Sequence, residues 1–232
     1  MQTFHKQLFY VEDADGGEII VSGEEFVHLV KVFRIKAGDV VRVSNGRGML
    51  FETQVSAVEK SRALLEVIQT TYTEPQCLHE LWISPLKNHD RLEWLVEKCT
   101  ELGLFAIRFV VCAHTEKPQV NMQRLRKLCV AAAKQSGNTR LPELHAPLPL
   151  FEVPMFSGET QLYVAHCRKE GMHDLLSLEL KKSSAVLIGP EGDFSETEIV
   201  QLTSRGAMEI SLGRMKLRSE TAGLKAAVWL SK

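Results

Sequence analysis

The stretch LIGPEGDFSETEI, residues 187–199, carries an apolar run through a glycine-containing loop into the start of a helix. Ser195 and Glu198 have the spacing of a capping box, in which each side chain satisfies a free backbone N–H of the other residue. Phe194 and Ile199 have the spacing of the hydrophobic staple that accompanies such a helix start. The sequence therefore predicts a strand, a tight loop and then a helix with a well-specified beginning.

The loop at residues 189–192 is unsuited to a phosphate. It has neither the lysine of the G-x-x-x-x-G-K-[ST] motif nor the free N–H donors of G-x-G-x-x-G. Pro190 removes one donor, and Glu191 adds a charge of the wrong sign. These residues favour a neutral or cationic guest, such as an adenosine edge or a sulfonium. On this stretch alone, a simple Gly-Pro turn is an equally good interpretation.

A second stretch, ISLGRMKLRSETAGLKAA at residues 210–227, combines a strand end, an irregular basic segment and a helix rich in small residues. Leu217 stands between charged neighbours, where an apolar side chain can form one wall of an adenine pocket. Charged runs of this kind hold RNA phosphates in some proteins and face solvent in most. The basic side chains are Arg214, Lys216 and Arg218.

The first 72 residues are predicted to form a small β-barrel-like unit. Helical spacing of Phe26, Leu29, Val30 and Phe33 predicts one short helix within it. A boundary is expected near TTYTEPQC, residues 70–77, where Pro75 interrupts strand pairing. The runs that predict strands are EIIVSG, GDVVRVSNG, GMLFETQVSAV and RALLEVIQTTY.

From residue 73 onward, strands alternate with helices, which indicates a mostly parallel α/β sheet. Helices are predicted within residues 88–103 and 121–137, the first with Gly103 at its C-terminal cap. The predicted strands are HELWISPLK, FAIRFVVCA, TQLYVAHC, SAVLIGP and MEISLG, and each of the last three is followed by a helical pattern. Because ligands bind beyond the carboxyl ends of such strands, the loops after YVAHC, VLIGP and ISLG form the candidate site.

The composition restricts the class of protein. A chain of 232 residues with 44% hydrophobic and 25% charged residues is typical of a globular protein of one or two domains. No apolar run is long enough to span a membrane, and the N-terminus lacks the plan of a signal peptide, so a cytoplasmic location is expected. Five cysteines without paired spacing predict reduced thiols and no metal site. With a net charge of −1, a nucleic acid would have to meet a local basic patch.

Together, IGPEGDFSETE and LGRMKLRSETAGLKAA resemble the two C-terminal signature loops of the ribosomal RNA small subunit methyltransferase E family, in the knotted SPOUT superfamily. Three further stretches, HLVKVFRIKAGD, SPLKNHDRLEWLVEKCTELG and KQSGNTRLPEL, extend the resemblance in the same order, so that it covers nearly the whole chain. The matching residues in these stretches are His28, Val32, Arg34, Gly38, Asp39, Lys87, Arg91, Glu93, Lys98, Glu101, Leu102, Gly103, Gln135, Ser136 and Pro142.

The resemblance implies an S-adenosylmethionine-dependent enzyme that methylates N3 of uridine 1498 in the 16S rRNA of the small ribosomal subunit. It implies a PUA-like β-barrel for RNA binding in residues 1–72. It also implies an α/β SPOUT domain with a C-terminal trefoil knot in residues 73–232, and a homodimer formed through that domain. The candidate cofactor-binding residues, by position in the three loops, are Val164, Ala165, His166, Ile188, Gly189, Pro190, Gly192, Ser211, Leu212, Gly213, Leu217, Thr221 and Ala222.

The implied reaction assigns candidate catalytic roles, because uridine N3 loses a proton when it is methylated. Arg218 can stabilise the negative charge that develops on O2 or O4 of the base. Glu191 or Glu220 can accept the proton, and Glu191 can instead contact the positive end of the cofactor. The sequence does not choose between these roles. The candidates for an RNA-facing basic patch are Arg34, Arg47, Lys87, Lys134, Arg140 and Arg214.

Two features of the second loop are unusual for the family it resembles. Arg214 and Met215 stand where many members have proline and then arginine, so Arg218 carries more weight than Arg214. Gly223 lies inside a predicted helix, which glycine weakens, and a close backbone approach at a dimer interface or a knot would account for it.

Other functions remain open from the residues alone. The same scaffold serves ribose 2′-O and tRNA base methyltransferases, and a non-catalytic ribosome-assembly factor could keep the fold. His166 is also compatible with a purely packed or solvated side chain. A dinucleotide-dependent oxidoreductase is disfavoured, because no G-x-G-x-x-G follows a predicted strand.

Overall fold

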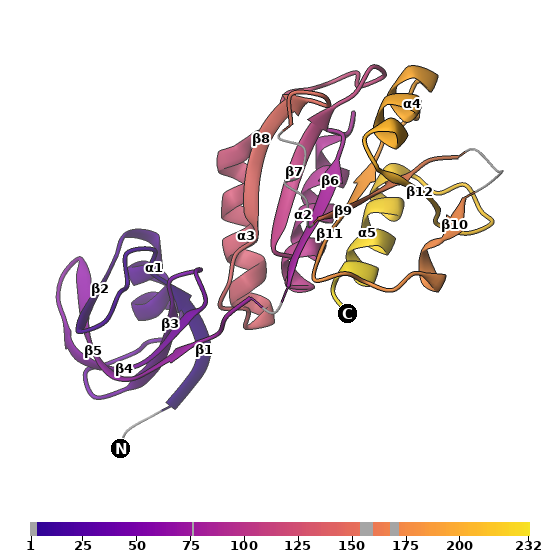
Figure 1. The fold of residues 1–232 in the computed structure, drawn as a ribbon. Coiled ribbons are helices and arrows are strands. Elements are labelled where there is room, and N and C mark those ends of the chain that lie inside the picture. The colour runs from indigo at the N-terminus through magenta and orange to yellow at the C-terminus, as the bar shows by residue number, and fades with distance from the viewer. Residues whose placement is uncertain (1–3, 76, 154–159, 168–171) are drawn as a thin grey trace. The chain divides into compact units, whose positions relative to one another are not determined.

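The computed structural model describes residues 4–75, 77–153, 160–167 and 172–232. The chain divides into two compact units (Figure 1). The first unit comprises Met1–Pro75 and Val130–Leu141, and the second comprises Gln76–Cys129 and Pro142–Lys232. A segment from the middle of the chain therefore belongs to the N-terminal unit.

The first unit is built on a five-stranded sheet in the order β1-β3-β4-β5-β2. Only the β1–β3 pairing is parallel. Register shifts within the long β4–β5 pairing are irregularities of the kind that bend and twist a sheet. Four strands match the predicted runs, whereas β1 was not predicted. The strands are β1 (Phe4–Tyr10), β2 (Glu18–Ser22), β3 (Val40–Ser44), β4 (Met49–Val58) and β5 (Arg62–Tyr72).

The predicted short helix of this unit has two parts. The α-helical turn α1 (Gly23–Val27) continues directly into a π-helical turn, η1 (His28–Val32). Leu29 is fully buried in the core of the unit, and Phe26 packs against the same core. The predicted apolar spacing is therefore confirmed, although the widened turn was not foreseen.

The last turns of helix α3 (Met122–Ser136) and the residues after it complete the first unit. The backbone N–H of Gly48 donates to Thr139 O at 2.9 Å. The ammonium of Lys134 lies 2.6 Å from Glu25 Oε2. The other oxygen of Glu25 accepts the N–H of Tyr10 at 2.8 Å. Lys134, a predicted RNA contact, is thus an ion-pair partner inside this unit.

We expect Lys134→Ala to lower the free energy of unfolding of the first unit by about 2 kcal/mol, a loss between those of exposed and fully buried ion pairs. The side chains of Lys134 and Glu25 are only 16% and 17% exposed, so the variant leaves a shielded carboxylate without its cation. Hydrogen exchange of the β3 and β4 amides measures the effect. Lys127→Ala, which alters an exposed residue of the same helix, is the control. Equal stabilities of the two variants would contradict the assignment.

The second unit contains a seven-stranded sheet in the order β10-β12-β9-β11-β6-β7-β8, and every pairing is parallel. The predicted parallel α/β sheet is confirmed. The strands are β6 (Leu78–Ile83), β7 (Ala106–Val111), β8 (Glu143–Pro149), β9 (Gln161–Ala165), β10 (His173–Asp174), β11 (Ser183–Ile188) and β12 (Met208–Ser211). The other helices of this unit are α2 (His89–Glu101), α4 (Glu196–Ser204) and α5 (Ser219–Leu230).

Helices cover both faces of this sheet (Figure 1). Trp82, Val164 and Leu187 from three strands share an apolar cluster with Ile199 and Leu202 of α4. Helix α5 instead packs against β6, β11 and α2. The sheet is therefore buried between layers, as its apolar strands require.

The prediction of a helix after TQLYVAHC is wrong for the described residues between β9 and β11. His173 and Asp174 pair in extended form with Ile210 and Ser211 of β12. The carboxylate of Asp174 then caps a single 3₁₀ turn, η2 (Leu175–Ser177), by accepting the N–H of Leu176. Pairing with β12, as the edge strand β10, takes the place of the helix.

The predicted helix ends are confirmed. Ser195 and Glu198 form the capping box at the start of α4. Gly103 follows α2 with φ +74°, the left-handed conformation typical of a glycine after a helix. The trefoil knot implied by the resemblance stays a prediction.

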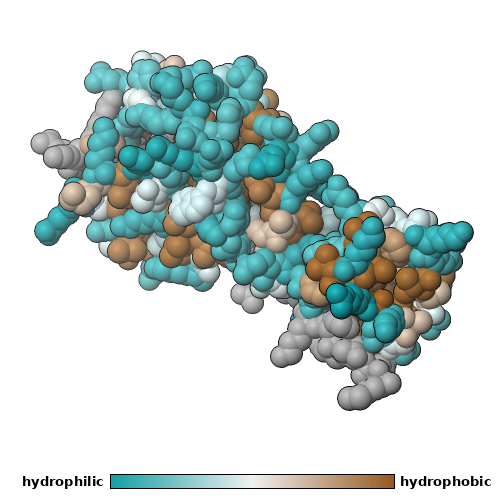
Figure 2. Space-filling view, turned by 180° about the vertical axis from the view of Figure 1, so that it is seen from behind, coloured by the Kyte–Doolittle hydropathy of each residue, from teal (hydrophilic) through white to brown (hydrophobic). Residues whose placement is uncertain are grey.

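The two units show mixed surfaces in the view of Figure 2. Hydrophilic residues cover most of the visible face of the second unit, interrupted by small apolar groups, whereas apolar residues gather near the middle of the visible face of the first. In the described ranges, no helix combines the length and the apolar character needed to cross a membrane.

Candidate active site

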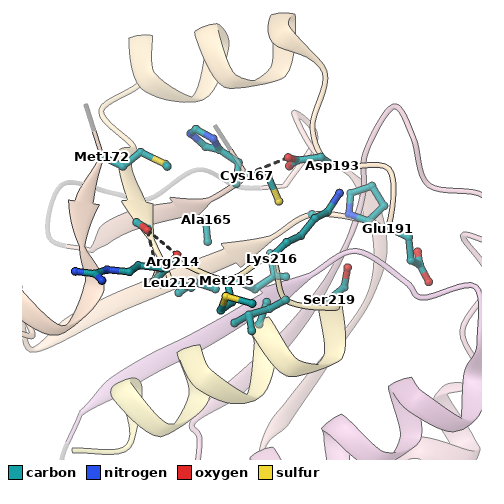
Figure 3. A pocket seen from close by; sticks show the side chains of 18 of the residues that line it. Ala165, Cys167, Met172, Glu191, Asp193, Leu212, Arg214, Met215, Lys216 and Ser219 are labelled. Carbon is teal, nitrogen blue, oxygen red and sulfur yellow. Dashed lines mark hydrogen bonds between the residues drawn. The ribbon is translucent and has the colours of Figure 1, made fainter. Parts of the chain in front are cut away.

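A cavity of about 920 Å³ lies at the carboxyl ends of β9, β11 and β12 (Figure 3). Because β9 lies between β12 and β11, the loops that follow these three parallel strands meet at one edge of the sheet. These are the three loops that the sequence singled out. Residues 165–167, 188–193 and 211–217 line the cavity, together with Met172, Asp174, Ser219 and Ala222.

The cavity brings together most of the predicted cofactor-binding residues. Val164 is instead fully buried in the sheet, and Thr221 is exposed on α5 and is not among the lining residues. Those that line it are Ala165, His166, Ile188, Gly189, Pro190, Gly192, Ser211, Leu212, Gly213, Leu217 and Ala222.

Close packing explains the small residues of the loop after β11. A Cβ on Gly189 would lie 2.9 Å from the ring of Phe194, which is buried at the start of α4. A Cβ on Gly192 would lie 3.1 Å from Cβ of His114. The carbonyl of Pro190 accepts the N–H of Asp193 at 3.0 Å, which closes the turn. The loop is thus a compact turn against two neighbouring side chains.

The loop after β12 is held by helix α5. Gly213 has φ +111°, a conformation that side chains rarely adopt. The N–H of Gly213 donates to Ser211 Oγ at 3.2 Å, and the ammonium of Lys225 donates to the carbonyl of Leu212 at 2.7 Å. The basic segment that follows therefore starts from a fixed turn.

The three predicted catalytic residues occupy different positions. Glu191 lines the cavity, but one of its carboxylate oxygens accepts the N–H of Lys87 at 3.0 Å. Glu220 lies outside the lining, 13% exposed, with its carboxylate 3.6 Å from Arg91 Nη1. Arg218 also lies outside the lining and is exposed at the N-cap of α5, directly before the lining residue Ser219.

The predicted RNA-binding residues are distributed over both units. Arg34, Arg47, Lys134 and Arg140 belong to the first unit, and Lys87 and Arg214 belong to the second. Arg140 donates to Thr73 O at 3.0 Å and lies over the ring of Tyr72, and Arg47 donates to Glu12 O at 2.9 Å. Lys87 pairs with Glu116 at 2.7 Å, whereas Arg214 lines the cavity.

Sequence reasoning missed several residues around the cavity. Cys167 and Asp193 line it, and His114 contacts the carbonyls of Gly192 and Asp193 through Nδ1 at 3.2 and 2.9 Å. His114 follows β7, whose carboxyl end lies at the same edge of the sheet. The rule that found the other three loops would also have found this residue.

Two polar side chains directly after β9, those of His166 and Cys167, line the cavity. The ring of His166, only 1% exposed, contacts Glu209 Oε2 through Nε2 at 2.6 Å. Burial raises the pKa of the Cys167 thiol, and nearby Asp193 raises it further, whereas Lys216 lowers it. A thiol that stays protonated is a poor nucleophile, so this side of the cavity does not favour covalent catalysis.

Within the part of the chain that the structure describes, no cluster of His, Cys, Asp or Glu is placed to hold a metal ion.

Family models match both parts of the chain. An RNA methyltransferase domain matches residues 74–231, and an RNA methyltransferase PUA domain matches residues 21–68. The predicted fold class is confirmed as a PUA-like unit followed by an α/β RNA methyltransferase domain, by these matches together with the observed sheets.

Curated relatives and solved structures resemble the chain over almost its full length. Ribosomal RNA small subunit methyltransferase E of Bacillus subtilis is 29% identical over 97% of this chain and 94% of the relative. The protein of the same name from Rickettsia conorii is 29% identical over 92% of this chain and 89% of the relative.

Two crystal structures share the fold. A probable rRNA-methyltransferase from Porphyromonas gingivalis superposes with a TM-score of 0.89 at 28% identity, covering 96% of both chains. A ribosomal RNA small subunit methyltransferase E from Neisseria gonorrhoeae, bound to S-adenosyl methionine, superposes with a TM-score of 0.83 at 23% identity, covering 96% of this chain and 95% of that one. With an RNA methyltransferase domain matched over far more than half of its length, the chain belongs to this RNA methyltransferase family, whose curated members include the ribosomal RNA small subunit methyltransferases E.

Proposed function

We propose that the protein uses S-adenosylmethionine to methylate N3 of one uridine, uridine 1498, in the 16S rRNA of the small ribosomal subunit. The observation that carries the proposal is the cavity at the ends of β9, β11 and β12, which the three predicted loops enclose. The names of the full-length relatives support the ribosomal substrate.

The cavity suits this cofactor. Its volume of about 920 Å³ is at the upper end of the range of small-molecule pockets, which leaves room for a nucleoside cofactor and part of a target base. Ile188 and Pro190 are buried and Leu217 is partly buried, so the lining offers apolar contacts for an adenine ring. Lys216 supplies a positive charge for the carboxylate of the cofactor's amino-acid end. When bound, the cofactor supplies an electrophilic methyl group on a sulfonium.

The chain's own residues must manage the N3 proton and the charge that it leaves behind. We assign Arg218 to the developing negative charge on O2 or O4, because its guanidinium is exposed beside the cavity and free to meet RNA. Between the two candidate proton acceptors, the geometry favours Glu191. Glu191 is exposed and lines the cavity, whereas Glu220 is largely buried in its pair with Arg91.

RNA binding is assigned to basic residues of both units. Arg34, Arg47 and Arg140 offer cationic groups on the PUA-like unit, and Lys87 and Arg214 do so beside the cavity. If these groups meet phosphates, the affinity for RNA falls steeply as salt concentration rises. A homodimer formed through the methyltransferase domain and a cytoplasmic location complete the proposal.

Calorimetric titration with S-adenosylmethionine and mapping of methylated uridines test the proposal. We expect saturable binding of the cofactor, and loss of N3-methyluridine from the 16S rRNA of a strain that lacks this protein. Retention of the mark in that strain would refute the assigned reaction. Absence of cofactor binding would favour a non-catalytic assembly factor. A mark lost from another RNA would indicate a different methyltransferase on the same scaffold.

A further inference from the structure

Asp193 adopts an unfavourable backbone conformation at the edge of the cavity. Its φ of +62° lies in the left-handed region, which favours glycine, and among the described non-glycine residues only Arg34 shares a positive φ. The turn bond from Asp193 N to Pro190 O and the contacts of His114 Nδ1 with the carbonyls of Gly192 and Asp193 hold this conformation in place. A strained residue held this firmly at a candidate site points to a role for its side chain.

The carboxylate of Asp193 joins two of the three loops. Its Oδ2 accepts the N–H of Cys167, in the loop after β9, at 3.0 Å. Its Oδ1 accepts the N–H of Phe194, in the loop after β11, at 2.9 Å. Figure 3 shows the bond between Asp193 and Cys167 at the rim of the cavity, and both residues belong to the two loops that line it. Because an ionised acceptor makes strong hydrogen bonds, the tie is stronger than one between neutral groups.

The tie lies beyond the strand ladder that joins β9 and β11. Strands β9 and β11 are paired through Ala165 and Ile188, but beyond these residues the ladder ends and the loops separate around the cavity. Among the described residues, the bond from Cys167 N–H to Asp193 Oδ2 reaches from one loop to the other beyond the ladder. We propose that Asp193 is a positioning residue, whose carboxylate fixes the distance between the loops after β9 and β11 and so the width of the cofactor site.

The inference rests on the proposed cofactor and is tested with Asp193→Gly. This variant removes the tie and also relieves the backbone strain, so the two effects on stability oppose each other. We expect the melting temperature to stay within a few degrees of the original, and the Kd for S-adenosylmethionine to rise about tenfold. If Asp193 only stabilised the fold, the loss of binding free energy for S-adenosylmethionine would not exceed the loss of unfolding free energy.

Asp193→Asn is the matched variant, because asparagine enters the left-handed region about as readily as aspartate and keeps one acceptor oxygen. We expect it to lose about threefold in affinity, less than Asp193→Gly. Arg34→Gly, at the other strained position, calibrates the change in melting temperature that strain relief produces away from the cavity.

The outcomes separate this inference from the proposed function. Failure of the unaltered protein to bind S-adenosylmethionine would overturn the proposed function. Binding by the unaltered protein together with an affinity of Asp193→Gly within twofold of it would overturn only the role of Asp193. If Asp193→Gly and Asp193→Asn both showed a sharp fall in melting temperature and an equal loss of affinity, Asp193 would be a structural residue. That result would also overturn the inference.

Discussion

Arg218→Ala is expected to lower the rate of uridine methylation by about 10²- to 10³-fold, the loss typical of removing one group that stabilises a developing oxyanion. In the proposed reaction, removing the N3 proton leaves negative charge on the base, which the guanidinium of Arg218 would offset. The affinity for S-adenosylmethionine should stay within about twofold, because Arg218 is exposed and outside the lining of the cavity. The fold should also persist, because the side chain makes no capping hydrogen bond to α5.

Single-turnover methylation of small subunits that lack the mark, with saturating enzyme, measures this effect without a contribution from product release. Arg218→Lys keeps the charge but loses the planar fork of donors, so we expect a smaller loss of rate. Arg218→Gln removes the charge and keeps a polar side chain, so its rate should resemble that of Arg218→Ala. Unchanged turnover of Arg218→Ala would remove the residue from the mechanism.

The place of the cavity could be predicted because it depends on features that the sequence carries locally. Three apolar runs give β9, β11 and β12, and the loops after parallel strands lie at one edge of the sheet. The sequence does not contain the strand order, however. Only the structure places β9 between the other two strands, and that order makes one cavity of three loops.

The strands β8 and β1, which the sequence did not predict, lack a strong local sequence signal. Strand β8 carries Pro147 and Pro149, and such a sequence is tolerated because β8 is an edge strand whose outer side needs no ladder partner. Strand β1 is likewise an edge strand. The capping box at Ser195 and the glycine after α2 were predicted correctly, because both depend on a few neighbouring residues.

The roles of individual polar residues were harder to predict than the loops that carry them. Lys134 is basic and was therefore predicted to contact RNA, but it forms an ion pair with Glu25, which lies 109 positions away in the sequence. Asp193 and Cys167 are 26 positions apart, and their bond exists only because β9 and β11 are neighbours. A single sequence cannot pair such residues, since long-range contacts follow from the fold.

Gly223 shows how an anomaly in the sequence can become a packing requirement. A Cβ at this position would lie 2.7 Å from Cδ2 of Leu95, a buried residue of α2. The close approach that the sequence led us to expect is therefore made within the second unit, between α5 and α2. Glycine weakens the helix, but it allows the two helices to pack closely.

We expect Gly223→Val to lower the free energy of unfolding of the second unit by about 3 kcal/mol, because the added methyl groups overpack the contact with Leu95. For a unit of this size the melting temperature should fall by roughly 6–12 °C. Ser219 and Ala222 line the cavity from the same helix, so a displaced α5 should also weaken binding of S-adenosylmethionine. Thermal unfolding with and without the cofactor measures both effects. Val228→Ala, at an exposed position of α5, is the control.

A double-mutant cycle distinguishes a local clash from a general weakening of the helix. Leu95→Ala alone should be destabilising by about 2–5 kcal/mol, because it leaves a cavity beside Gly223. In Leu95→Ala/Gly223→Val the new side chain occupies part of that cavity, so the combined loss should be smaller than the sum of the two single losses. Strict additivity would mean that Gly223→Val acts through the helix backbone alone, and the close approach of α5 to α2 would then not be the reason for this glycine.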